Sequence, residues 1–201
     1  MTREFTFTVP DGFVELPVDD IDVDGTEKHE LDRRVANAFG LAADDSNAAM
    51  LANTYALYGE TMGSQGIDYA AIAIYRSPDA PDRPIMPILA SSCIPSEHES
   101  VDVAIEGLLQ THESTEAGST RTLSLPAGTA VVTVRENKTI LHGDDADGVE
   151  VHVLRRQVTA WIPDPKGTSI AMVAVCSNNW QDWEHVAVLA LDIFDTVSWV
   201  G

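Results

Sequence analysis

Residues 149–176 read VEVHVLRRQVTAWI, then PDPKG, then TSIAMVAVC, and this stretch decides the fold. In its first part Val149, Val151 and Val153 alternate with Glu150 and His152. That alternation is typical of an antiparallel strand with one buried face. The five residues that follow are too few for the helix that connects parallel strands. The stretch therefore predicts two adjacent antiparallel strands, 149–162 and 168–176.

The same reasoning extends outward along the chain. Further extended segments are expected at 5–9, 13–16, 67–76, 85–94, 120–125 and 129–135, and the first two are expected to form an N-terminal hairpin or corner. Helices are expected after Asp24, over 46–58 with Gly59 as the stop, from Ser96 to about 112, and after an Asn179 cap. Consecutive strands joined by short turns predict an α+β fold. We expect an antiparallel sheet of six to seven strands flanked by helices, in one domain spanning 1–201.

Charge is the unusual feature of the composition. The chain has 32 Asp and Glu but only 12 Lys and Arg, which gives a net charge of −20. A surface this negative repels phosphate backbones and anionic lipid, so broad electrostatic binding to nucleic acid or to a membrane is excluded. The acidity also suits a salt-adapted cytoplasm, where it reports solubility and no site. A basic protein partner is the one electrostatic prediction that remains.

Location and redox state follow from what the sequence contains. Residues 1–5 show no apolar region of the length a signal peptide needs, and no apolar run reaches the length of a membrane span. We therefore expect a cytoplasmic protein. Cys93 and Cys176 both lie in apolar, strand-like segments, which predicts buried thiols and no disulfide.

Two acidic loops offer candidate chemistry. Asp20, Asp22 and Asp24, followed by Gly25, match the first half of a calcium loop, but Leu31 occupies the position where a bidentate Glu is required. An EF-hand is therefore excluded, and a different kind of calcium loop competes with an acidic turn that caps a helix. Residues 142–148 gather His142 with three aspartates, as a metal or acid–base site would, yet Asp-Gly is also an ordinary hairpin turn.

Trp161 is the candidate for a partner surface. Trp180, Trp183 and Trp199 are expected on the last helix, where aromatic residues mostly pack in the core. Trp161 is out of phase with Val158, Ala160 and Ile162 of its strand. It is therefore expected on the opposite side of the sheet, either under a helix or on an exposed partner surface.

Three phrases carry a resemblance to a known family. They are Gln157–Pro165 followed by the strand Ser169–Ser177, the closing segment Leu191–Trp199, and the opening phrase Val9–Phe13. In this order they resemble Mog/PsbP-like proteins, and the two expected helices within 26–60 depart from that pattern. The resemblance implies an α/β/α sandwich and a non-enzymatic module, because members bind a small GTPase in one branch and a photosystem assembly in another. It carries over no catalytic residue.

Two hypotheses for function follow. The first is a protein-binding or assembly module without cofactor or catalysis, which the missing Walker, GxGxxG and GxSxG motifs favour. The alternative is a small metal-dependent or hydrolytic enzyme that uses His142 with Asp144, Asp145 or Asp147. Calcium at Asp20, Asp22 and Asp24 is a narrower possibility within the metal-binding class.

Overall fold

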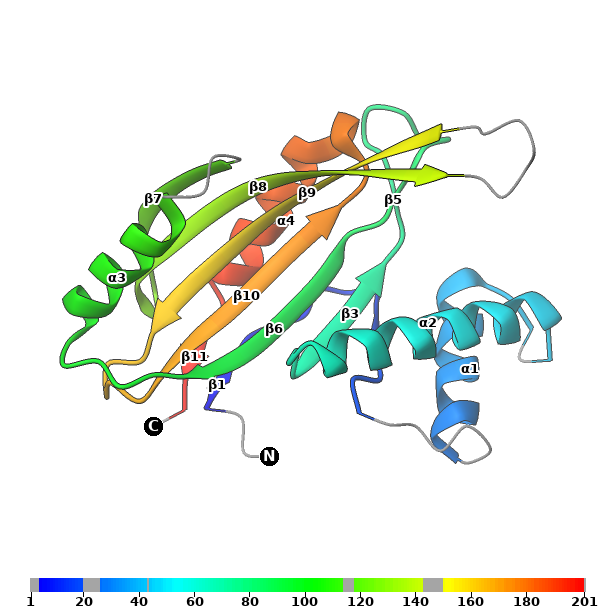
Figure 1. Ribbon diagram of the computed structural model, residues 1–201. Coiled ribbons are helices and arrows are strands. Elements are labelled where there is room, and N and C mark those ends of the chain that lie inside the picture. The colour runs from blue at the N-terminus through cyan, green and yellow to red at the C-terminus, as the bar shows by residue number, and fades with distance from the viewer. Residues whose placement is uncertain (1–3, 20–25, 43, 114–117, 143–149, 201) are drawn as a thin grey trace.

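The computed structural model describes residues 4–19, 26–42, 44–113, 118–142 and 150–200 (Figure 1). Its strands are β1 (Phe5–Thr6), β2 (Phe13–Leu16), β3 (Tyr69–Ala73), β4 (Tyr75–Arg76), β5 (Pro84–Ile85), β6 (Ile88–Pro95), β7 (Gly118–Leu125), β8 (Gly128–His142), β9 (Glu150–Pro163), β10 (Ser169–Ser177) and β11 (Ser198–Trp199). Its helices are α1 (Thr26–Phe39), α2 (Ser46–Ser64), α3 (Val101–Glu113), the 3₁₀ turn η1 (Trp180–Asp182) and α4 (Trp183–Phe194).

One seven-stranded sheet forms the centre of the molecule, in the order β2-β3-β6-β10-β9-β8-β7. Every neighbouring pair in it is antiparallel. The predicted α+β class, with an antiparallel sheet flanked by helices, is confirmed. The two strands predicted within 149–176 are observed as the neighbouring β9 and β10, with Trp161 opposite Met172.

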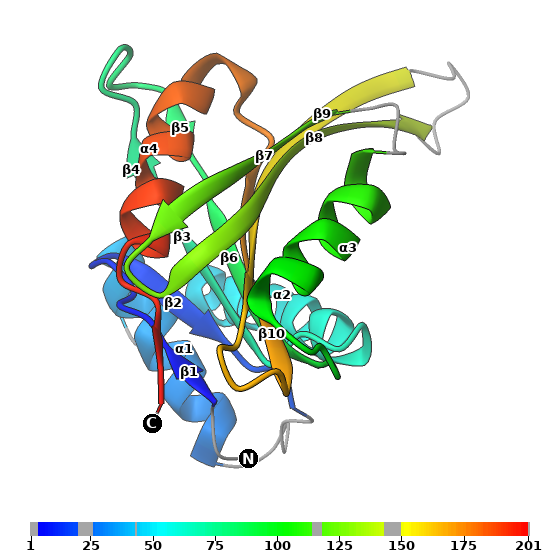
Figure 2. The same cartoon turned by 90° about the vertical axis from the view of Figure 1, so that its left-hand side faces the viewer.

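The β8–β9 pair is the longest in the sheet, running from Val131 opposite Trp161 to His142 opposite Glu150. The sequence predicted strand only to residue 135 on the first of these two segments. Figure 2 shows the pair extending past the other strands and curving toward the side of the sheet that carries α2 and α3. The extension places residues 135–138 and 154–157 at one edge of the molecule, and some of these residues form part of the candidate site described below.

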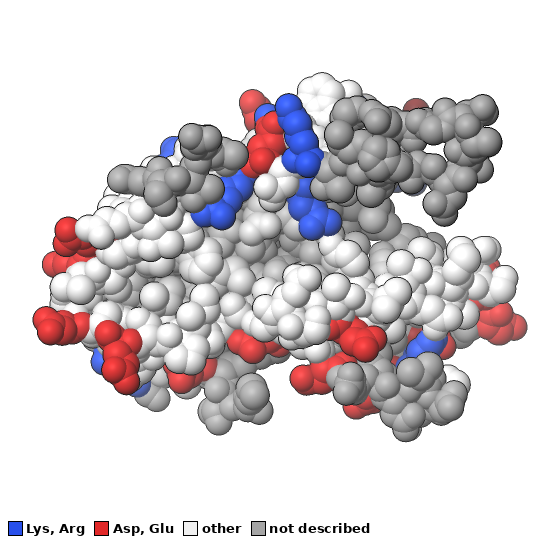
Figure 3. Space-filling view, in the orientation of Figure 1, with Lys and Arg blue, Asp and Glu red and all other residues white. Residues whose placement is uncertain are grey.

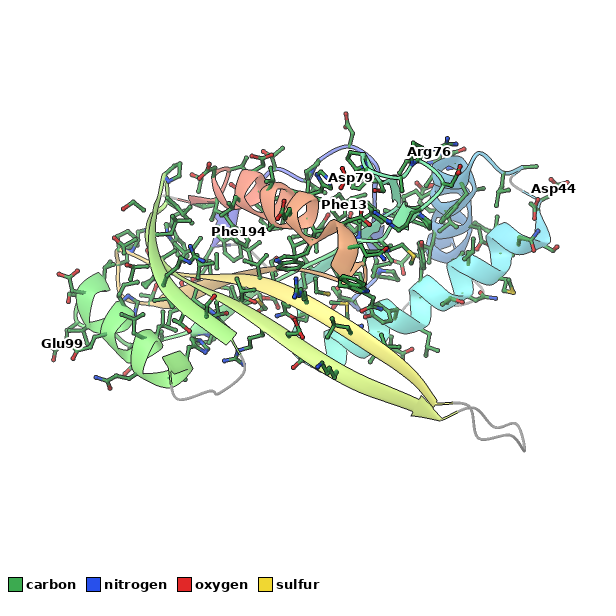
Figure 4. All side chains as sticks on the ribbon, turned by 90° about the horizontal axis from the view of Figure 1, so that it is seen from above. Phe13, Asp44, Arg76, Asp79, Glu99 and Phe194 are labelled. Carbon is green, nitrogen blue, oxygen red and sulfur yellow. The ribbon has the colours of Figure 1, made fainter. Side chains whose placement is uncertain are left out.

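Helix α4 covers one face of the sheet. Its buried side chains Val186, Ala190, Ile193 and Phe194 pack on strand residues that include Val158, Ala160 and Ile162. The terminal strands β1 and β11 pair with each other beside this core, with Phe5 opposite Trp199. Figure 4 shows α4 on this side of the sheet, with α2 and α3 on the other. The apolar core on this face is the larger of the two cores in the described residues.

The opposite face carries helices only at its two ends (Figure 1). Helices α1 and α2 bury Leu31, Val35, Ala52 and Tyr55 against the β2 and β3 residues Val14, Leu16, Ala70 and Ile72. Helix α3 packs on β7, β8 and β9 at the other end. The strands β6 and β10 lie between the two helical blocks. Among the described residues, no helix is long and apolar enough to cross a membrane.

Three local predictions were wrong, each because a distant contact decides the local structure. The N-terminal hairpin does not form, because β1 pairs with β11 and β2 with β3. Trp199 lies in strand β11 and not on the last helix, which ends at Phe194. Asn179 does not cap that helix, because its side chain accepts a hydrogen bond from the Met86 N–H and donates one to the Pro84 carbonyl.

Helix α2 also continues past Gly59, the expected stop, to Ser64. The reason lies in the packing of the helix on the segment after β2. A Cβ on Gly59 would lie 2.0 Å from the Pro17 carbonyl oxygen, and one on Gly63 would lie 1.7 Å from that of Val18. Both glycines let the helix approach another backbone closely, and that close approach, not helix termination, is their role.

Candidate functional site

We call the sheet face that carries α2 and α3, together with the exposed side of α2, the open face. Residues on it are identified by their strand phase, since successive side chains point to opposite faces. Trp161, Thr159, Gln157 and Arg155 are out of phase with the β9 residues that pack under α4, so they belong to the open face. Figure 3 shows this face, with the surface between the two helices set back from both.

Trp161 lies under α3, which is one of the two places expected for it. Its ring is tilted 31° to the His112 imidazole of α3, with the ring centres 4.9 Å apart. The indole is half-buried, and its Nε1 is shielded from solvent without a hydrogen-bond partner among the described residues. Trp161 therefore forms part of the wall where α3 meets the sheet, with one polar atom unused.

The exposed side of α2 is almost free of charge. Glu60 is the one Asp, Glu, Lys or Arg residue in this 19-residue helix, whereas the 14-residue α1 contains six residues of these four types. Met50 and Leu57 are 61% and 65% exposed, and they lie seven residues apart on the same side of the helix. Figure 3 shows a broad uncharged surface over this helix, with acidic side chains along the lower edge of the face. In a chain of net charge −20, this is the least charged exposed helix side.

Basic side chains gather at the upper edge of the same face (Figure 3). Arg135 of β8 donates from Nη2 to His112 Nδ1 of α3 at 2.8 Å. Arg155 of β9 donates from Nη2 to the Tyr58 hydroxyl of α2 at 3.1 Å. Each arginine thus links the sheet to one of the two helices. Arginine, tyrosine and tryptophan are the residue types that contribute most to binding at protein interfaces.

The His112 ring has a defined protonation state in this arrangement. Burial lowers the pKa of His112, and the nearby Arg135 charge lowers it further. A guanidinium can only donate hydrogen bonds, so Nδ1 must be the unprotonated, accepting nitrogen of a neutral ring. The open face therefore presents its positive charge on the arginines and not on the histidine.

A cavity of about 650 Å³ lies at the edge of the sheet beside Trp183 of α4, and Arg135 of the open face also lines it. Its lining includes Trp183, Val134, Glu136, Lys138 and Arg156. The Arg156 Nε donates to the Glu136 carboxylate at 2.9 Å, so these two charges neutralise each other. The cavity is wide open to solvent, and besides this ion pair its lining carries the basic side chains of Arg135 and Lys138. It is therefore a shallow extension of the basic edge and a weaker candidate than the open face.

A buried polar cluster ties the loop before β5 to the start of α4. The Asp182 carboxylate, 0% exposed, accepts hydrogen bonds from Arg83 Nε at 2.7 Å, Arg83 Nη2 at 2.9 Å and the Ser77 hydroxyl. The hydrogen bond from Arg83 is the main cause that lowers the pKa of Asp182. Asp79 pairs with His185 at 3.0 Å beside it.

Asp79, Asp182 and His185 are close enough to hold a metal ion, and they are the one such group among the described residues. Both Asp182 oxygens already accept hydrogen bonds, two of the three from a guanidinium. A cation at this place would have to displace Arg83, because like charges repel at contact distance. The cluster is therefore best explained as a structural link. His185 bonds Asp79 and not Ser77, so no serine–histidine pair forms here either.

The two acidic loops singled out in the sequence lie outside the described residues. They are the candidate calcium ligands Asp20, Asp22 and Asp24, and the cluster formed by the His142 side chain with residues 143–148. Calcium binding and the enzymatic alternative both stay predictions. Cys93 and Cys176 are free thiols, as expected, but both are half-buried and not buried as predicted. Partial burial raises the pKa of both.

Sequence reasoning missed Arg135 and Arg155. It treated charge as a total for the chain and noted no basic patch, because the two residues are 20 positions apart. The signal that could have found them is the β8–β9 pairing register. Gln157 lies opposite Arg135, which places Arg155 two positions along the neighbouring strand and on the same face.

Comparisons with models of protein families, with curated proteins and with solved structures gave no match to this chain. The resemblance to Mog/PsbP-like proteins thus stays a prediction. What the chain does has to be argued from its own surface.

Proposed function

We propose that this chain is a non-catalytic module that binds a protein partner on the open face. The observation that carries the proposal is the exposed side of α2, where Met50 and Leu57 are exposed and Glu60 is the one charged residue, in a chain of net charge −20. Exposed apolar side chains of this kind are typical of the centre of an interface, from which charged residues are depleted. The Mog/PsbP-like phrases agree with such a role, since the family they resemble contains binding proteins.

The electrostatics of the face suggest how the partner is oriented. Acidic side chains border its lower edge, and its upper edge carries basic side chains with acidic ones among them (Figure 3). A partner with basic groups opposite the acidic edge would be steered to this face, and its affinity would fall with salt. The partner is thus expected to be basic outside the central contact. Nothing in the described residues favours the enzymatic alternative over this reading.

Co-purification from native lysate tests the proposal when it compares matched variants. Met50→Glu and Leu57→Glu place a charge on the exposed side of α2, and both positions are far from buried. Val188→Glu is the control, because Val188 is an exposed apolar residue, 58% accessible, on α4 at the other face. We expect a stoichiometric partner with wild type and Val188→Glu that is lost with both α2 variants.

Two results would count against the proposal. One is the absence of any stoichiometric partner at low and moderate salt. The other is a partner that all three variants retain equally, since this would place the interface away from α2. Circular dichroism of each variant should match wild type, because none of the three side chains is buried.

A further inference from the structure

Arg135 and Arg155 lie side by side on the open face. Arg135 is opposite Gln157 in the β8–β9 pair, so Arg155 is its diagonal neighbour on the same face. Diagonal neighbours on adjacent strands have Cα atoms about 7–8 Å apart. Two guanidinium groups attached at this separation can both reach one oxyanion between them.

Within the part of the chain that the structure describes, Arg135 and Arg155 bond polar groups other than carboxylates. Among the described residues, Arg135 bonds His112 and Arg155 bonds Tyr58, and both of those partners are neutral. Other basic residues do pair with carboxylates: Lys28 with Asp32, Arg33 with Glu30, Arg34 with Glu15, Arg83 with Asp182 and Arg156 with Glu136. Among the described residues, the side-chain bonds of these two half-buried arginines therefore go to an imidazole and a hydroxyl.

The arginines are also held in place. Arg135 is fixed to α3 and Arg155 to α2, so the two bonds hold them from opposite helices. A guanidinium has five N–H donors, and Arg135 and Arg155 each use one of them in the hydrogen bonds described. The remaining donors are suited to bidentate recognition of a carboxylate, which forms hydrogen bonds about twice as strong as neutral ones. Ordering them in advance lowers the entropy cost of binding.

We propose that Arg135 and Arg155 together bind a carboxylate of the protein partner, either an acidic side chain or the C-terminus. This inference rests on the proposed function, because it assumes that the partner lies on the open face beside α2. Charge complementarity selects the occupant: a basic partner is steered by the acidic edge, and one acid group on it pairs with the two arginines. Tyr58 contacts Arg155, and Trp161 lies against His112, the partner of Arg135.

The test uses the full chain and small probes, since the partner is unidentified. The probes are the capped tripeptide Gly-Glu-Gly, its uncharged match Gly-Gln-Gly, and inorganic phosphate at equal ionic strength. Two-dimensional NMR follows the Trp161 indole N–H and the Nε–H signals of Arg135 and Arg155. We expect a saturable shift of these signals with the glutamate peptide and none with the glutamine peptide.

Variants then assign the shift to the two arginines. Arg135→Gln and Arg155→Gln should each weaken binding of the glutamate peptide at least about tenfold, as expected for loss of a charged hydrogen bond. Arg121→Gln is the matched control, because Arg121 is an exposed arginine on β7 in the opposite strand phase, and it should bind as wild type does. The rest of each variant's spectrum should stay in place, which establishes that the fold is kept.

Three outcomes would overturn the inference. Equal shifts with both peptides would show that charge is not recognised, and unchanged binding in both arginine variants would place the site elsewhere. Shifts with phosphate but not with the glutamate peptide would make the site one for phosphate. In the lysate assay, a partner lost with Leu57→Glu but kept with the double arginine variant would refute this inference and leave the proposed function intact.

Discussion

Gly59→Ala in α2 should destabilise the protein, although the same change stabilises most helices. Alanine is favoured over glycine in a helix interior by about 1 kcal/mol. At Gly59, however, the added Cβ would lie 2.0 Å from the Pro17 carbonyl oxygen, where ordinary contact begins at 3.4 Å. Backbone atoms cannot rotate away as a side chain can. The helix or the segment after β2 would therefore have to move by more than an ångström.

The size of the effect follows from the two opposing terms. Overpacking of a core contact costs about 1–3 kcal/mol, and a rigid backbone neighbour places this site toward the upper end. After the gain in helix propensity, the net loss is about 2 kcal/mol. For a chain of this length that corresponds to a fall in Tm of about 4–8 °C. Leu16 and Tyr55 are buried between the same elements, so the loss acts on the core under α2.

Urea unfolding and thermal melting of the purified variants provide the assay. Gly107→Ala is the control: Gly107 is also within a helix, α3, but its added Cβ meets nothing within 4 Å. That variant should gain up to about 1 kcal/mol, or about 2–4 °C in Tm. The reasoning fails if Gly59→Ala is as stable as Gly107→Ala, because the close approach of α2 to Pro17 would then not exist.

Two further predictions concern pH. The pKa of His112, measured by NMR, should lie below 6.5, and Arg135→Gln should raise it only in part, because burial is the larger cause. The pKa of His112 is lower in the folded protein than in the unfolded chain. The stability that neutral His112 contributes is therefore present above about pH 6.5 and is lost as pH falls through the pKa of the folded state. A measured pKa of 6.5 or higher would contradict this prediction. Asp182 has a lowered pKa, mainly through the Arg83 hydrogen bond, so its contribution is present above its ordinary pKa of 3.8 and is lost in more acidic solution. The unfolding free energy of wild type should therefore fall more steeply below about pH 4 than that of Asp182→Asn, and parallel curves in urea titrations at each pH would contradict the prediction.

Local patterns predicted the elements well where one face of a strand or helix is buried. The alternation from Val149 onward and the short turn after Ile162 correctly gave the β9–β10 pair. Alternation works because each strand must place its apolar side toward a core, whatever its neighbours are. The same information could not predict that Gly59 lies inside α2, because the reason is the Pro17 backbone 42 residues earlier.

The candidate site was less predictable than the fold. The phase of Trp161 along its strand correctly placed it on the opposite side of the sheet from Ala160, yet it could not say which helix lies above. The N-terminal strands were expected to pair with each other because they are adjacent in sequence. They pair with β11 and β3, because those partners place Phe5, Val14 and Leu16 in the two cores.

The sequence by itself determined the acidic charge, the α+β class and the phase of each long strand, since these depend on composition and on residues close together in the chain. Only the tertiary structure decided that α2 and α3 share one face and that Arg135 and Arg155 meet there. Strand register and helix docking bring together residues far apart in sequence, and no local pattern encodes which of them will be neighbours. The net charge of −20 therefore describes the surface as a whole, while the place of the two arginines on one face of the sheet is a property of the fold.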